Sequence, residues 1–145
     1  MSSEEAFEKS VFLPCPPARA FHLFTEEASI WWPPTRRHTD DADSQISLSA
    51  TGRFWERAQS GQEVELGVVR AWEPPRRLLL DFYPGTDAQH PTEVEVSFAQ
   101  EGAGTRVIVR HRPTAASAAL WTGRVARFAG SWDLLLPALA QHAGG

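Results

Sequence analysis

The chain has 145 residues, of which 42% are hydrophobic and 22% charged, and its formal net charge is −4. Length and composition indicate a single globular domain over residues 1–145 that is large enough to bury a core. The arginines are dispersed among acidic residues, which argues against nucleic-acid binding, because phosphate backbones require a clustered basic face. The single cysteine, Cys15, excludes an internal disulfide and is compatible with a reducing compartment.

The N-terminal segment MSSEEAFEKS lacks the basic and then apolar order of a signal peptide. No apolar run approaches the ~20 residues that would span a bilayer. We therefore expect a cytoplasmic protein with no membrane insertion.

The first predicted elements are a strand over residues 5–13 and two short helices. The CPP sequence stops the strand, since proline cannot donate to a ladder, and Pro17 suits the first turn of a helix. The WWPP sequence ends the helical run, because the residue before a proline avoids the helical region. The polar segment 35–45 is predicted to be a surface loop. The helical apolar positions are Ala20, Phe21, Phe24, Ala28 and Trp31.

Six further strands are predicted, starting with QISLSA and RFWERA. From residue 63 onward, apolar and polar residues alternate, which is typical of an antiparallel meander with one buried face. The double proline at positions 74 and 75 marks a turn. The inward-facing positions are predicted to be Val64, Leu66, Val68, Arg70, Trp72, Leu78, Leu80, Phe82, Val94, Val96, Phe98, Val107, Val109 and His111.

A long amphipathic helix is predicted at the C-terminal end, with Pro137 expected to kink or fray its last turn. This helix would cover the buried face of the sheet. The predicted fold class is therefore α+β, with a curved antiparallel sheet of about seven strands around a long helix, and a cavity wherever the two surfaces do not match. The apolar positions of the helix are Leu120, Trp121, Val125, Phe128, Trp132, Leu135, Leu136 and Leu139.

Six segments in this order and spacing carry a resemblance to a known superfamily. They are AFHLFTEEASIWWPP, GRFWER, GVVRAWEPPRRLLLDF, TEVEVSF, GTRVIVRH and GSWDLLLPAL. The chain resembles the START or helix-grip (SRPBCC, birch-pollen-allergen-like) superfamily, in the branch named for activators of the heat-shock-protein-90 ATPase. This resemblance implies a fold that binds small hydrophobic molecules between sheet and helix, in members that carry lipids, cyclise polyketides or assist a chaperone.

Large rings on the inward positions are the first candidates for ligand contact. Two interpretations stay open for them: they fill an ordinary core, or they line a cavity. These rings are Phe54, Trp72, Phe82, Trp121 and Phe128. Trp31 and Trp32 precede a proline pair and a polar loop at the expected cavity mouth, and we expect Trp32 to be the exposed ring that gates it.

Three polar side chains share the predicted inner face. A lone histidine such as His111 is more often a hydrogen-bonded core residue than a catalyst. Glu56 and Arg70 would form a buried ion pair with each other, or would supply the polar contacts that orient a ligand.

No motif for metal, nucleotide or nucleophilic chemistry stands out. The loop RRHTDDAD has a histidine and three aspartates, but its spacing matches no calcium or zinc pattern. Cys15 has no identifiable partner base, and no G-x-S-x-G or phosphate-binding glycine loop is present. We expect no metal and no cofactor.

Three functional hypotheses follow from the sequence. The first is the binding of a small apolar or aromatic molecule in the cavity. The second is a cyclase or aromatase, in which His111 with Glu56 or Arg70 moves protons. The third is a protein-interaction module, with an exposed apolar patch around Trp55 beside Arg53 and Arg57. A protein partner or a homodimer is compatible with all three.

Overall fold

The computed structural model describes residues 6–144. Its seven strands form one antiparallel sheet in the order β1-β7-β6-β5-β4-β3-β2. The elements are β1 (Phe7–Leu13), α1 (Pro17–Thr25), α2 (Ala28–Trp31), the 3-10 helix η2 (Pro34–Arg36), β2 (Gln45–Leu48), β3 (Arg53–Arg57), β4 (Glu63–Glu73), β5 (Arg77–Phe82), β6 (Thr92–Glu101), β7 (Gly104–Arg112) and α3 (Ala118–Gly144). The predicted α+β helix-grip architecture is confirmed.

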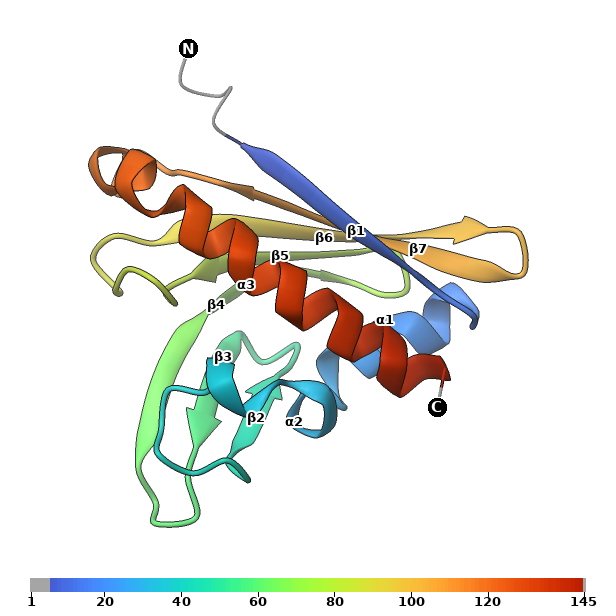
Figure 1. The fold of residues 1–145 in the computed structure, drawn as a ribbon, viewed down its shortest axis with the longest axis horizontal. Helices are drawn as coiled ribbons and strands as arrows, with labels where there is room; N and C mark the ends of the chain where they lie inside the picture. Colours follow the sequence, from blue (N-terminus) through green and yellow to red (C-terminus); the bar gives the residue numbers. More distant parts are fainter. Residues whose placement is uncertain (1–5, 145) are drawn as a thin grey trace.

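Helix α3 lies across one face of the curved sheet, as Figure 1 shows. Near the C-terminal end of α3, helix α1 contacts β6, β7 and α3, and helix α2 contacts β2 and α3. The two short helices therefore close one end of the space between sheet and α3. None of the helices within residues 6–144 is long and apolar enough to cross a membrane.

The predicted alternation places the expected residues in the core along β5, β6 and β7. In β6, Val94, Val96 and Phe98 are buried while the residues between them are partly exposed. Successive side chains of a strand point to opposite faces, so this period of two buries one side of the sheet.

Strand β4 departs from the predicted alternation because it carries two irregularities. Its register shifts between Phe54 and Trp55 of β3, and again between its own Val69 and Ala71 against β5. Each extra residue reverses which face the following side chains point to. Between the two shifts, Val68 and Arg70 therefore face solvent, and their predicted inward positions are wrong.

Helix α3 continues through Pro137 to Gly144, so the predicted fraying of its last turn is wrong. Beyond the proline, Leu139 is fully buried in the core. His142 Nε2 also lies 2.8 Å from Glu27 Oε1, which ties the last turn to the segment between α1 and α2. These tertiary contacts stabilise the turn against the missing amide hydrogen bond.

Candidate functional site

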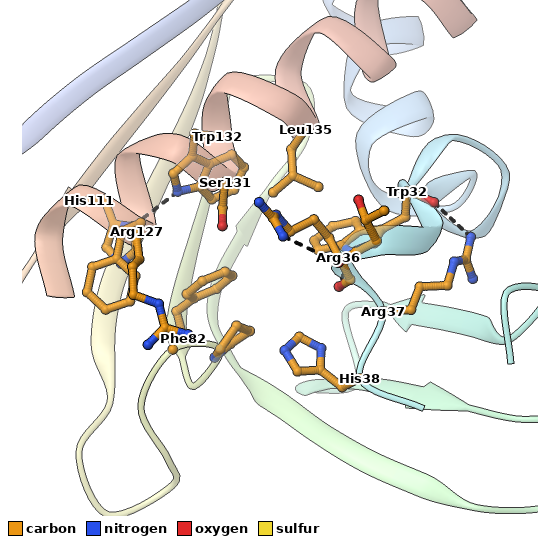
Figure 2. A pocket seen from close by; sticks show the side chains of 14 residues that line it. Trp32, Arg36, Arg37, His38, Phe82, His111, Arg127, Ser131, Trp132 and Leu135 are labelled. Atoms are coloured by element: carbon orange, nitrogen blue, oxygen red, sulfur yellow. Dashed lines mark hydrogen bonds between the residues drawn. The ribbon is translucent and has the colours of Figure 1, made fainter. Parts of the chain in front are cut away.

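A cavity of about 170 Å³ lies between the middle of α3, the end of β5 and the segment around η2 (Figure 2). It lies nearer the N-terminal end of α3 than the part of the helix that α1 contacts. Its lining residues are Trp32, Thr35, Arg36, Arg37, His38, Phe82, Pro84, Gly85, His111, Arg127, Phe128, Ser131, Trp132 and Leu135.

The inner wall of the cavity is aromatic. The ring centroids of Phe82 and Trp132 are 5.8 Å apart and the rings are 31° from parallel. The Phe128 ring lies 4.7 Å from that of His111 at 32°. Such separations are typical of packed aromatic pairs, so these rings form a continuous aromatic wall.

His111 is fully buried in this wall, and both of its ring nitrogens are engaged. Trp132 Nε1 donates a hydrogen bond to His111 Nδ1 at 3.1 Å, and His111 Nε2 lies 2.8 Å from Thr92 Oγ1. Because Nδ1 accepts, the neutral ring carries its proton on Nε2 and donates it to Thr92, whose hydroxyl donates to the Phe82 carbonyl at 3.1 Å. Burial lowers the pKa of His111 from 6.5 to about 3.

Arg70 does not join this site. It sits on the outer face of the sheet, where its Nη1 lies 2.8 Å from Asp81 Oδ1 and its side chain is 54% exposed. The predicted pairing of Arg70 with Glu56 is therefore wrong, and the cause is the pair of register shifts in β4. The predicted proton-transfer trio of His111, Glu56 and Arg70 is not assembled.

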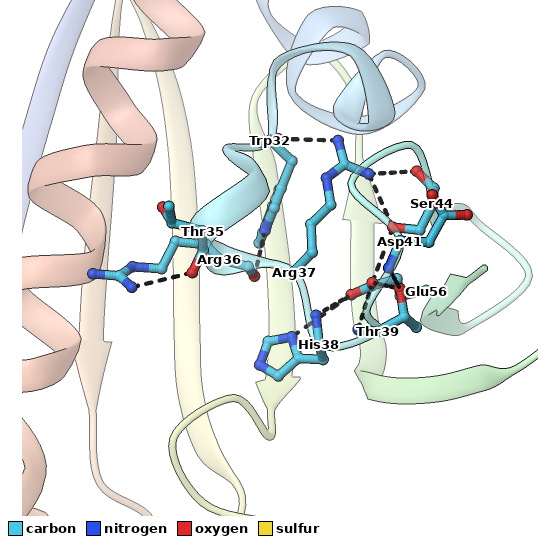
Figure 3. Close-up of polar contacts among 9 residues, drawn as sticks. All are labelled: Trp32, Thr35, Arg36, Arg37, His38, Thr39, Asp41, Ser44 and Glu56. Atoms are coloured by element: carbon cyan, nitrogen blue, oxygen red, sulfur yellow. Dashed lines mark hydrogen bonds and ion pairs between the residues drawn. The ribbon is translucent and has the colours of Figure 1, made fainter.

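Glu56 is fully buried and organises the loop that follows η2 (Figure 3). Its carboxylate accepts hydrogen bonds from the backbone N–H groups of His38 (2.8 Å) and Thr39 (2.9 Å). It also accepts hydrogen bonds from the hydroxyls of Thr39 (2.7 Å) and Ser44 (2.9 Å). Burial alone would raise the pKa of Glu56, but these hydrogen bonds outweigh it and hold that pKa below its usual value.

Arg37 fixes the other side of the same loop. Its Nη2 donates to the carbonyls of Ser29 (2.7 Å) and Trp32 (3.0 Å), and its Nη1 donates to the Ser44 carbonyl and hydroxyl. Residues 35–38 of the segment predicted as a surface loop thus form part of the cavity wall, whereas Asp40, Ala42 and Asp43 are exposed. Arg36, Arg37 and His38 were not among the predicted site residues. The signal for them is a glutamate at an inward position of β3, because a buried carboxylate requires donors from a nearby segment.

Trp32 lines the cavity, but the prediction that it is an exposed gate is wrong. The side chain is 4% exposed, and Trp31 is 5% exposed. Both indoles are held by backbone acceptors: Trp32 Nε1 donates to the Arg36 carbonyl at 3.1 Å, and Trp31 Nε1 donates to the Leu23 carbonyl at 2.7 Å. The polar loop folds over Trp32 instead of leaving it at the surface.

The remaining predicted ligand residues lie behind or away from the cavity. Phe54 packs behind the wall, with its ring centroid 6.1 Å from that of Phe82. Trp121 packs on the far side of His111 and Phe128. Trp72 meets Phe21 edge-on at 5.1 Å, at the end of the sheet that α1 covers.

Gly85 brings the turn after β5 against α3 at the cavity rim. Its φ is +87°, and a Cβ there would lie 2.3 Å from Phe128 Cε1. Arg124 of α3 donates to the Gly85 carbonyl at 2.8 Å. The turn can approach the Phe128 ring this closely only with glycine at that position.

Trp55 is half-buried on the outer face, so the predicted exposed apolar patch around it is not present. The Arg53 guanidinium lies 4.2 Å from the Trp55 ring centroid and pairs with Glu63 and Glu65. Within residues 6–144, no group of three or more His, Cys, Asp or Glu side chains is placed to hold a metal ion.

Solved structures with this fold come from proteins of different kinds. The self-sacrificing resistance protein CalC from Micromonospora echinospora is 24% identical, with a TM-score of 0.75 over 95% of this chain and 93% of that one. An HSP90 activator from Plasmodium falciparum is 18% identical, with a TM-score of 0.68 over 96% of both chains. The anthrahydroquino-gamma-pyrone synthase Txn09, complexed with SUM, is 25% identical, with a TM-score of 0.52 over 83% of this chain and 86% of that one.

A search of curated proteins found no match. The family described as "Activator of Hsp90 ATPase homolog 1-like protein" matches residues 14–144. Since the match spans nearly all of the 145 residues, this chain belongs to that family.

Proposed function

We propose that this protein binds a small apolar molecule in the cavity beside His111. The observation that carries the proposal is a pocket of about 170 Å³, open to solvent on one side, with Phe82, Phe128 and Trp132 in its wall. In another protein, an engineered apolar cavity of about 150 Å³ is enough to bind benzene. The size therefore favours a ligand of one or two aromatic rings over a lipid with long tails.

The expected affinity is weak. A ligand that buries about 300 Å² of apolar surface gains about 7 kcal/mol before the cost of association is subtracted. A net 7 kcal/mol would correspond to a dissociation constant of about 10 μM, so after the association cost the constant is expected in the millimolar range. Titrations followed by NMR or by tryptophan fluorescence suit this range, because Trp32 and Trp132 both line the cavity.

The state of His111 supports binding over proton transfer. Its Nδ1 already accepts from Trp132, and its Nε2 already bonds to Thr92. A pKa of about 3 keeps the ring neutral near pH 7. A general base needs a free nitrogen facing the substrate and a pKa near the working pH.

Protein interaction through the outer face of β3 has less support. The family description refers to an Hsp90 ATPase activator homologue, but Arg53 covers the ring of Trp55. The large hydrophobic side chains exposed within residues 6–144 are Phe12, Ile30, Val68 and Leu134, which lie on different elements. Single exposed apolar residues are normal on a soluble surface and do not indicate a docking site.

A titration with the neutral ligand naphthylmethanol tests the proposal. We expect shifts in the amide resonances around Phe82, Phe128 and Trp132, and a change in tryptophan fluorescence that saturates. Ser131→Phe should abolish binding, because Ser131 lines the cavity and a phenyl ring there would fill it. Ala126→Phe, at an exposed position on the same helix, is the matched control. Saturable binding that survives Ser131→Phe, or no binding at all, would contradict the proposal.

A further inference from the structure

The permanently charged residues that line the cavity are all arginines. Arg36, Arg37, His38 and Arg127 are among its lining residues, and no described lining residue is Asp or Glu. The whole chain has 18 acidic against 14 basic residues, so a cavity without a carboxylate departs from the average composition. The excess of positive groups lies on η2, on the following loop and on α3.

Two of these side chains, Arg37 and His38, already have partners. Arg37 points away from the cavity towards Ser44, and both of its terminal nitrogens donate to backbone carbonyls (Figure 3). His38 Nδ1 lies 3.7 Å from Glu56 Oε1, so the carboxylate of Glu56 already faces this ring.

Arg36 and Arg127 are different, because each extends its guanidinium towards the cavity without a carboxylate partner. Arg36 points towards α3, opposite to Arg37, and its Nη1 reaches only the Thr35 carbonyl at 3.3 Å. Its Nε is buried and has no hydrogen-bond partner. Within residues 6–144, Arg127 has no ion-pair or hydrogen-bond partner, and its side chain lies beside Phe82 in Figure 2.

An unpaired arginine alone would not indicate a ligand site. Arg76, for example, is exposed in the turn after β4 and also lacks a side-chain partner among the described residues. Arg36 differs from Arg76 because its Nε has lost contact with water without gaining an acceptor, which is unfavourable. The Nε of Arg37 is in the same state, but both terminal nitrogens of Arg37 already have acceptors and point away from the cavity. Two arginines from different elements converge on one apolar space, and a planar anion could accept hydrogen bonds from both.

We infer that the ligand is an aromatic acid: an apolar ring system that fits against Phe82, Phe128 and Trp132, with a carboxylate or similar anion held by Arg36 and Arg127. This inference rests on the proposed function and names the chemical class of its ligand. The aromatic wall supplies burial, and the two guanidinium groups at the mouth supply selection for negative charge.

Two ligands that differ only in charge test the inference. Naphthylacetate and naphthylacetamide share the ring system and nearly the same shape, and calorimetry can measure the binding of each. We expect the wild-type protein to bind the carboxylate about tenfold more tightly than the amide, as a charge-assisted hydrogen bond to a partly buried arginine would give. Raising the salt concentration should weaken binding of the carboxylate and leave that of the amide unchanged.

Variants locate the source of the selectivity. Arg36→Gln should lower the carboxylate affinity about tenfold and leave the amide affinity within about twofold. Arg127→Gln should lower the carboxylate affinity only about threefold, because Arg127 is exposed and screened by solvent. Arg76→Gln removes the same charge away from the cavity and should change neither affinity. Should Arg36→Gln fail to fold, Arg36→Lys keeps the charge and should retain part of the preference.

Equal affinities of the wild-type protein for the two ligands would overturn this inference and leave the proposed cavity intact. Binding of neither ligand would overturn both proposals. A preference for the carboxylate that persists in the Arg36→Gln and Arg127→Gln double variant would overturn the assignment to these two residues.

Discussion

The two ends of the inner face carry the same kinds of side chain but differ in what covers them. At the α1 end, Phe98 contacts the rings of Phe21 and Phe24 at 5.1 and 5.9 Å, and Trp72 packs edge-on against Phe21. At the other end, Phe82 and its neighbours face a cavity of about 170 Å³. Aromatic residues on an inward position therefore do not distinguish a core from a cavity.

The covering element makes the difference. Helix α1 inserts Phe21 and Phe24 between sheet and α3, which fills the space with apolar side chains. The opposite end is covered by the loop after η2, which hydrogen bonds hold to β3 through Glu56 and to α2 through Arg37. A loop fixed by hydrogen bonds holds its position without inserting apolar volume, so a space remains beneath it.

The largest expected effect compares one phenylalanine at each end. Phe98→Ala should lower the free energy of unfolding by about 3–5 kcal/mol, because the ring packs against the rings of Phe21 and Phe24. Phe128→Ala should cost about 2 kcal/mol, because one side of that ring already faces the cavity and has fewer contacts to lose. Urea unfolding measures both values, and equal losses would contradict the distinction between the two ends.

His111→Gln tests the buried hydrogen-bond network beside the cavity, because the free energy of unfolding should lose its dependence on the protonation of His111. The variant should lower the free energy of unfolding by about 2–3 kcal/mol at neutral pH, because Trp132 and Thr92 lose well-placed partners.

His111 should make the free energy of unfolding increase with pH between about 3 and 6.5. The pKa of His111 is about 3 in the folded protein against an ordinary value of 6.5, so between these values the unfolded chain binds the additional proton. The stabilisation is complete above pH 6.5 and is lost as the pH falls towards 3. The other four histidines are common to both proteins, so the difference between the two urea profiles isolates His111. Parallel profiles would contradict a neutral, buried His111.

Glu56→Gln tests whether hydrogen bonds to Glu56 hold the loop after η2 over the cavity. We expect a loss of about 2 kcal/mol near pH 7, because the amide presents donors to groups that are themselves donors. The folded-state pKa of Glu56 is lowered, so its stabilisation is present above the ordinary glutamate pKa and is lost as the pH falls through the folded value. Amide spectra should show the change concentrated in the loop after η2. Changes in the amide resonances of α1 instead would contradict the assignment of Glu56 to the loop after η2.

Arg70→Gln should have the smallest effect, below about 1 kcal/mol, because the Arg70–Asp81 pair is exposed to solvent. Thermal unfolding of the variant measures the loss, and the binding of naphthylmethanol should be unchanged. A loss of several kcal/mol, or weaker ligand binding, would place Arg70 on the inner face.

Much of the fold could be predicted because its period is regular. The alternation in β5 to β7 and the helical spacing of Phe128, Trp132 and Leu139 identified the buried face correctly. The errors fall where local periodicity is not the deciding factor. Arg70 faces outward because two register shifts depend on pairing with neighbouring strands. Trp32 is buried because a loop distant from its own helix period folds over it.

Parts of the site could not be predicted for the same reason. The arginines at the cavity mouth lie in a segment with no periodicity, and the sequence does not show that Arg36 and Arg37 point in opposite directions. His111 was identified as a hydrogen-bonded histidine, but its partner Trp132 comes from another element, and their contact depends on how α3 crosses the sheet.

The central claim is that the space between sheet and α3 is open at the His111 end and closed at the α1 end. Diffraction from crystals pressurised with xenon tests it most directly, because xenon enters apolar cavities large enough to hold it. We predict a xenon peak between Phe82, Phe128 and Trp132, and none between Phe21, Trp72 and Phe98. Absence of xenon beside His111, or a peak at the α1 end alone, would contradict the account.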